Sequence, residues 1–161
     1  MATDANAYRL EAKANSAEID SSYFKGRING TFSAAPEYFR SRSRKQAGWR
    51  PKVTADIRLD DVLINMPTIP QMSGGDSNLG LDVTLALGPK IRLYNKYLYD
   101  LWLKGGLKIT GSTVFPRIEG SIESEKGTVT YLRTRFKLDK GSLNWIEPGT
   151  FSVSYTHLTL P

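Results

Sequence analysis

The feature that most constrains the fold is an alternation of apolar and polar residues over residues 79–146, in short stretches separated by glycine. A period of two is typical of β-strands, because successive side chains of a strand point to opposite faces of the sheet. Glycine between such stretches favours tight turns, and so predicts consecutive antiparallel hairpins. The chain is therefore predicted to be all-β, an elongated and curled antiparallel sheet with one apolar face.

Three predicted turns set the register of these hairpins. One strand is expected over residues 91–103, followed by a three-residue loop at 104–106, because that loop length keeps the apolar positions on both sides of it on one face. A second turn is predicted at residues 126–127 and a four-residue loop at 139–142. The apolar face then has these lining residues: Leu93, Tyr97, Tyr99, Leu101, Leu103, Leu107, Ile109, Ile118, Ile122, Leu132, Phe136, Leu138, Leu143 and Trp145.

Earlier strands follow from the same alternation. They are predicted at residues 8–14, 24–32, 53–59 and 81–87, with Pro36 after the end of the second and Gly88 at the end of the last. Asp60 and Asp61 shift the phase of the alternation, so a β-bulge is expected there.

Three segments organise the chain. Residues 1–52 are predicted to form N-terminal strands and a basic loop of the same β-structure, and residues 53–151 the main antiparallel β-domain. Residues 152–161 do not continue the pattern and are predicted to be a tail foreign to the fold.

A basic run is the one strong local charge feature. Residues 40–52 hold six Lys or Arg and no acidic residue, in a chain of net charge +6. Two interpretations stay open: a patch that binds phospholipid headgroups or another acidic polymer, and a solvated loop between strands. Nucleic acid is not expected, because Trp49 alone is no stacking platform. The residues predicted to contact an anion are Arg40, Arg42, Arg44 and Lys45.

Patterns that would support catalysis or metal binding are missing from the sequence. His157 is the only histidine and there is no cysteine, so no metal-binding cluster or histidine dyad can be assembled from those residues. Glu119 and Glu123 alternate onto the polar face. We therefore expect no enzyme, no cofactor and no metal. No apolar run is long enough to cross a bilayer as a helix, and the N-terminus lacks the pattern of a signal peptide.

The glycine-punctuated half of the chain resembles the terminal domain of the TamB proteins, in the AsmA-like family. The residues that carry the resemblance are 81–85 (LDVTL), 107–111 (LKITG), 116–122 (PRIEGSI), 127–131 (GTVTY) and 136–145 (FKLDKGSLNW). Each piece is a common hairpin pattern, and their order and spacing are what resemble the family.

The resemblance implies a sheet open along one side, with an apolar groove for phospholipid transport to the outer membrane. It also implies a periplasmic location in a diderm bacterium, an inner-membrane anchor in a missing upstream part, and support of outer-membrane biogenesis beside a barrel assembly partner. An alternative remains from the residues alone: a structural or interaction β-module whose apolar face is simply its core.

Overall fold

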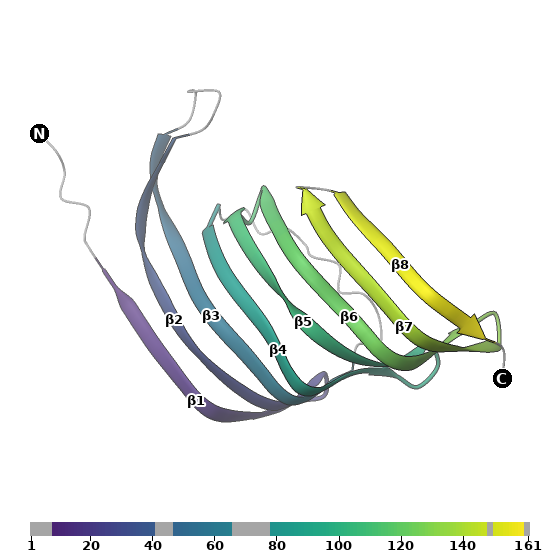
Figure 1. The fold of residues 1–161 in the computed structure, drawn as a ribbon. Helices are drawn as coiled ribbons and strands as arrows, with labels where there is room; N and C mark the ends of the chain where they lie inside the picture. The colour runs from purple at the N-terminus through teal and green to yellow at the C-terminus, as the bar shows by residue number, and fades with distance from the viewer. Residues whose placement is uncertain (1–7, 41–46, 66–77, 148–149, 160–161) are drawn as a thin grey trace, which may run out of the picture.

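The computed structural model describes residues 8–40, 47–65, 78–147 and 150–159. These residues form one sheet of eight strands (Figure 1). The strands are β1 (Leu10–Asp20), β2 (Phe24–Arg40), β3 (Ala47–Asn65), β4 (Gly80–Asn95), β5 (Tyr99–Ser112), β6 (Pro116–Tyr131), β7 (Thr134–Glu147) and β8 (Thr150–Thr159). Within this part of the chain no helix is long and apolar enough to span a membrane.

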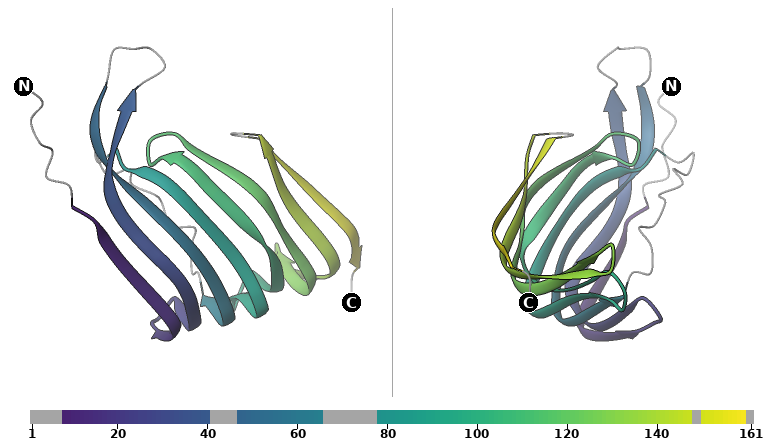
Figure 2. Two further views of the ribbon diagram at one scale, coloured as in Figure 1. Left: turned by 60° about the vertical axis from the view of Figure 1, so that its left-hand side comes forward. Right: turned by 90° about the vertical axis from the view of Figure 1, so that its right-hand side faces the viewer.

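The strands lie side by side in chain order. Every neighbouring pair is antiparallel except β3 and β4, which run parallel. Among the described residues, the extensive contacts of each strand are with its neighbours in the sheet, and no second layer covers either face (Figure 2). The prediction of an all-β, curled antiparallel sheet is confirmed, with the one correction that β3 and β4 run parallel.

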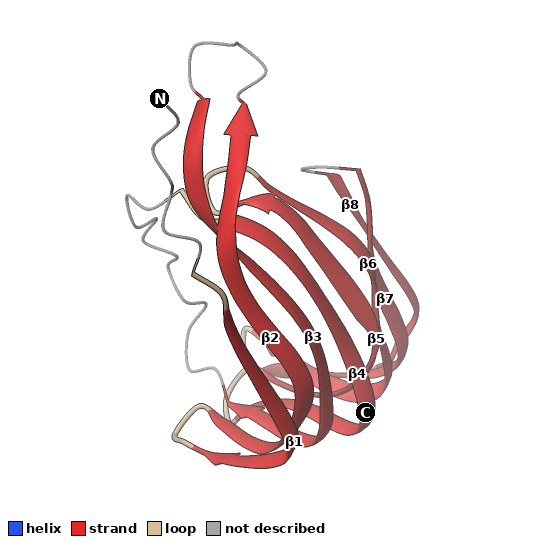
Figure 3. Ribbon diagram, turned by 90° about the vertical axis from the view of Figure 1, so that its left-hand side faces the viewer, coloured by secondary structure: helices blue, strands red, loops and turns tan. Residues whose placement is uncertain are grey.

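Each long strand bends partway along, so the sheet is a trough rather than a flat layer (Figures 2 and 3). The bends coincide with breaks in strand register, which fall at Ser16 in β1, Asp61 in β3 and Lys90 in β4. All three residues have positive φ, at 50°, 56° and 60°. Because a β-bulge adds residues to one strand only, it bends that strand and increases its twist.

The three predicted hairpin loops are wrong. Residues 104–106, 126–127 and 139–142 lie inside β5, β6 and β7, and Gly88 lies inside β4 instead of ending a strand. These stretches are the bends, and a bend needs the same residue types as a turn. Glycine supplies the positive φ, as at Gly105 with φ 117°, and charged side chains project from the outer surface.

The true turns lie elsewhere. The stretch 91–103, predicted as one strand, contains a turn at residues 96–98, and β6 and β7 are joined through Leu132 and Arg133. Strand β2 continues past Pro36, so the strand end predicted there is wrong. The bulge predicted at Asp60 and Asp61 is confirmed by the register shift between Leu59 and Leu63.

Two of the predicted segments look different in space. The division at residue 52 falls within β3, so both sides of it belong to the same strand. Residues 150–159 form edge strand β8, which pairs with β7 through three register irregularities. Whether this tail is foreign to the protein stays a prediction, and a deletion tests it below.

The buried core is small and lies at the bend. Leu59, Val62 and Ile91 are the buried cluster, with exposures of 7%, 1% and 0%. Ile57 and Ile64 pack against this cluster from either side of the β3 bend. Side chains from two arms of one strand converge only on the inner side of a bend, so the cluster marks the concave face.

Candidate functional site

The concave face of the long arm of the trough is apolar from strand to strand. Residues that are paired across neighbouring strands point their side chains to the same face of the sheet. One row of such paired residues runs from Ile57 to Leu85 and Leu107. The row continues through Gly120 and reaches Trp145 in β7. A parallel row runs through Ala55, Val83, Ile109 and Ile118.

The short arm continues the same face. Its row runs from Ile64 through Leu93 to Leu101, and reaches Leu138 of β7 beyond Gly127. The next row joins Tyr99, Val129 and Phe136. These two rows and the two of the long arm meet at the buried cluster, so one apolar surface lines both arms of the trough. We call this surface the groove.

Most of the predicted lining residues lie on this surface and are only partly covered. Those with intermediate exposure are Leu93, Tyr99, Leu101, Leu103, Leu107, Ile109, Ile118, Ile122, Phe136, Leu143 and Trp145, and Leu138 is 9% exposed. Two residues are corrected. Tyr97 and Leu132 lie in the turns, at 73% and 81% exposure, and do not line the groove.

The sequence analysis missed the part of the groove formed by β3 and β4. Ile57, Leu59 and Val62 belong to it, as does Leu85 beside them. Their alternation was visible in the sequence. The parallel pairing of β3 with β4 was not, because nothing in residues 66–77 indicates that the next strand starts at the same end.

Gly120 leaves room in the middle of the groove. It lies in the row between Leu107 and Trp145 with φ 123°, where other residues are strained. A Cβ built there would collide with the carbonyl oxygen of Gly106 in the neighbouring strand. The row therefore has a gap without a side chain between two large apolar residues.

The convex face is mostly polar, and several of its charged side chains form ion pairs. Arg92 donates two hydrogen bonds to Asp100, both of 2.7 Å, and its guanidinium lies 5.0 Å from the ring centre of Tyr94 and 5.7 Å from that of Trp102. The hydrogen bond from Arg92 lowers the pKa of Asp100. Lys104 pairs with Glu125 at 2.8 Å at the bend. These contacts stabilise the sheet, and the charged side chains keep its convex face hydrated.

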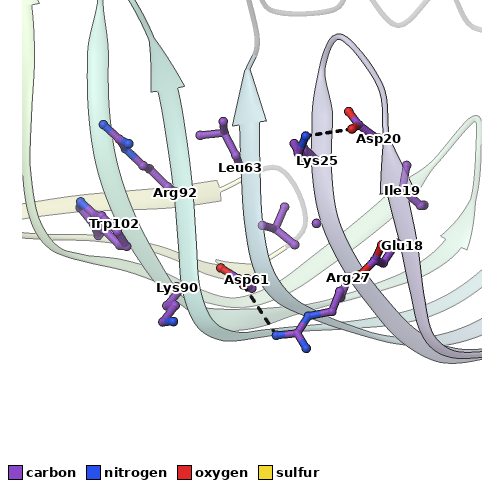
Figure 4. A pocket seen from close by; sticks show the side chains of 12 residues that line it. Glu18, Ile19, Asp20, Lys25, Arg27, Asp61, Leu63, Lys90, Arg92 and Trp102 are labelled. Atoms are coloured by element: carbon purple, nitrogen blue, oxygen red, sulfur yellow. Dashed lines mark hydrogen bonds and ion pairs between the residues drawn. The ribbon is translucent and has the colours of Figure 1, made fainter.

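A hollow of about 470 Å³ lies on this convex face, near the bend (Figure 4). Two ion pairs line it, Lys25 with Asp20 at 2.8 Å and Arg27 with Asp61 at 3.7 Å. Within the described ranges no group of acidic or histidine side chains could hold a metal ion. Most of its lining lies on the polar face, where Arg92 and Trp102 alternate with the groove residues along their strands, and it shares Val62 with the groove.

A two-stranded ribbon extends the sheet at the end where β2 and β3 are joined (Figure 3). Here β2 and β3 pair up to Arg40 and Ala47, beyond the first pairs that either strand makes with β1 or β4. The rings of Tyr38 and Trp49 meet edge to face, with centres 5.6 Å apart. They share the face of the groove, because the register of β2 and β3 is unbroken from Arg27 to the end of the ribbon.

The basic run belongs in part to this ribbon, so a loop over the whole of residues 40–52 is wrong. Arg50 lies 3.1 Å and Lys52 3.3 Å from the carboxylate of Glu37. Partial burial by itself raises the pKa of Glu37, and the hydrogen bonds from Arg50 and Lys52 outweigh it and lower that pKa. Of the predicted anion contacts, Arg40 is exposed at the end of β2. Arg42, Arg44 and Lys45 lie outside the described residues.

The fold and the groove define a class: a single β-sheet bent into an open trough with an apolar inside and a polar outside. The family model of the TamB C-terminal domain matches residues 65–151, more than half of the chain, and the chain belongs to this family. The family consists of envelope-associated proteins of diderm bacteria that act in outer-membrane assembly or lipid transport. No curated protein matches the chain.

Proposed function

We propose that the groove holds phospholipid acyl chains on their way to the outer membrane. The observation that supports this best is the incomplete cover of a continuous apolar surface. In the described structure most apolar side chains of both arms are half-buried, with Ala55 and Leu138 as buried exceptions, and the fully covered side chains, Val62 and Ile91, lie at the bend. Monomeric proteins rarely leave a large apolar surface open to water, and such surfaces mark binding sites.

The physical chemistry of the groove suits an acyl chain. Each CH₂ moved from water to an apolar surface contributes about 0.8 kcal/mol, so a chain lying across several strands is held without specific contacts. Neighbouring rows such as Leu85–Leu107 and Val83–Ile109 are chemically equivalent, so a chain can slide between them at little cost. The headgroup stays in water at the open side of the trough.

The remainder of the proposal follows the family. The chain acts in the periplasm as part of a protein anchored in the inner membrane, and it supports outer-membrane biogenesis beside a barrel assembly partner. It does so without catalysis and without a cofactor.

One observation favours a second function, that of a structural or interaction module. Leu59, Val62 and Ile91 are buried as a core is. If the entire apolar face serves only to hold the sheet together, the protein carries no lipid and the family role rests on assembly alone.

Lipid extraction from purified protein, followed by mass spectrometry, decides between the two. We expect bound phospholipid in the unmodified chain and none in Leu107→Asp, which puts an unpaired charge in the groove at a residue outside the buried cluster.

Thr110→Asp is the matched control. Thr110 lies on the same strand but on the polar face, where it is paired with Arg117. The Thr110→Asp variant should therefore keep its bound phospholipid. Unmodified protein without lipid, or equal loss of lipid in both variants, would contradict the proposal.

A further inference from the structure

Two neighbouring hairpin tips end the short arm of the trough, and both expose a Tyr-Leu pair. The tip between β4 and β5 holds Tyr97 and Leu98, which are 73% and 49% exposed. The tip between β6 and β7 holds Tyr131 and Leu132, which are 68% and 81% exposed. A hydrogen bond of 2.7 Å from the Thr130 amide to the Leu98 carbonyl joins the two tips. They form one exposed apolar surface.

The local chemistry of the second tip does not account for its sequence. Leu132 and Arg133 both have positive φ, at 48° and 69°, in a two-residue turn. Turns of this kind favour Asn and Gly, because a side chain with a Cβ is strained at positive φ. A leucine there costs stability and packs little. A residue that breaks a local rule without a structural gain points to a role in binding.

The charge around the tips is of one sign. Lys96 flanks the first Tyr-Leu pair, and Arg133 and Arg135 follow the second. Neither the stretch 95–99 nor the stretch 130–135 has an acidic residue. Tyrosine rings prefer the headgroup level of a bilayer, leucine prefers the acyl boundary, and basic side chains pair with anionic headgroups. The surface thus matches an anionic lipid bilayer in each of its three components.

We propose that these tips are a membrane-docking lip, made of Lys96, Tyr97, Leu98, Tyr131, Leu132 and Arg133, which inserts its apolar side chains into the headgroup region of an anionic bilayer. Tyr99 and Val129, which lie directly behind the tips, belong to the concave face. Docking therefore places the end of the groove at the membrane surface. The inference goes beyond the proposed function, since the lip docks whether or not the groove carries lipid.

A fluorescent label on the lip tests insertion in the whole chain. The protein has no cysteine, so a single Leu132→Cys can be labelled with an environment-sensitive dye without background. With vesicles of equal parts phosphatidylglycerol and phosphatidylethanolamine, we expect a blue shift of the dye. Phe115→Cys is the matched control, because Phe115 is 79% exposed in the turn between β5 and β6, at the opposite ends of those strands. A shift at residue 115 and none at residue 132, or equal shifts at both, would overturn the proposal.

Vesicle sedimentation of unlabelled protein separates docking from stability. Leu132→Asn suits the turn better than leucine does, so it should raise or maintain the melting temperature while weakening vesicle binding about tenfold. Lys96→Ser with Arg133→Ser should weaken binding about thirtyfold. Unchanged vesicle binding in Leu132→Asn, or binding that is lost only when the basic residues 40–45 are replaced, would show that the lip does not dock.

Discussion

The free energy of folding is expected to be concentrated at the bend, and alanine substitutions at Ile91 and Leu107 should show this. Ile91 is fully buried against Leu59 and Val62. Ile91→Ala removes about three carbons at about 0.8 kcal/mol each and leaves a cavity, for a total loss of about 3 kcal/mol. Leu107 is half-buried on an open surface. Leu107→Ala leaves no closed cavity there, and should cost about 1 kcal/mol.

The assay is urea unfolding of lipid-free protein, because a bound ligand would stabilise the folded state. In a chain of this size, a loss of about 3 kcal/mol lowers the melting temperature by about 6 to 12 °C. The dependence of the unfolding free energy on urea concentration should be the same in both variants as in the parent, because neither substitution changes much of the surface area that unfolding exposes. If Leu107→Ala costs as much as Ile91→Ala, the long arm is a covered core and the open groove does not exist.

Three further predictions concern acid, charge and the tail. Asp100 and Glu37 have lowered pKa values in the folded protein, so their contribution to stability is present above the pKa of the unfolded chain and is lost as the pH falls through the folded pKa. The urea concentration at the unfolding midpoint should therefore decrease as the pH is lowered below about 4, and Asp100→Asn should make this decrease smaller. If the basic run is an anion-binding patch, serine in place of its basic residues should weaken binding to anionic liposomes by about 1 kcal/mol for each charge removed, with the melting temperature nearly unchanged. A large drop in that temperature would make the run structural. Those residues are Arg40, Arg42, Arg44 and Lys45. Deleting residues 153–161 should leave the urea midpoint unchanged within error, because β8 is an edge strand with broken register, and a loss of several kcal/mol would mean that the tail is a genuine strand.

The alternation of the sequence predicted the apolar face better than it predicted the turns. Leu103 and Leu107 share a face in the structure because β5 continues without a break in strand structure through the bend at residues 104–106. A three-residue loop would also have kept them on one face, since either arrangement separates them by an even number of positions. The prediction of which residues share the apolar face therefore stayed correct although the loop predicted at residues 104–106 was wrong.

Bends and turns could not be told apart, because they use the same residues. The sequence Lys104-Gly105-Gly106 is compatible with a hairpin loop and equally compatible with a bend inside a continuous strand. The difference lies in register with the neighbouring strands. Three residues of β4, Gly88 to Lys90, lie opposite Lys104 alone, which shows that the corner is shared across the sheet. A single strand read by itself does not contain that information.

The exposed tips show the opposite case, in which the sequence carried a signal that was misread. Leu132 fits the alternation of its neighbours and was assigned to the groove for that reason. Its position in a tight turn became visible only from the pairing of Tyr131 with Thr134. Alternation alone does not distinguish an apolar residue within a strand from one at the turn between two strands.

The most direct test of the groove is photocrosslinking to lipid from adjacent positions of β5. Leu107 faces the inside of the trough and Lys108 faces the polar outside, so a photoreactive amino acid at either site samples one face at the same depth along the strand. The protein should be irradiated in intact cells, and phospholipid attached to it measured by mass spectrometry. Phospholipid attached at residue 107 and absent at residue 108 is the predicted result. No attachment at residue 107, or equal attachment at both, would contradict a groove that carries acyl chains.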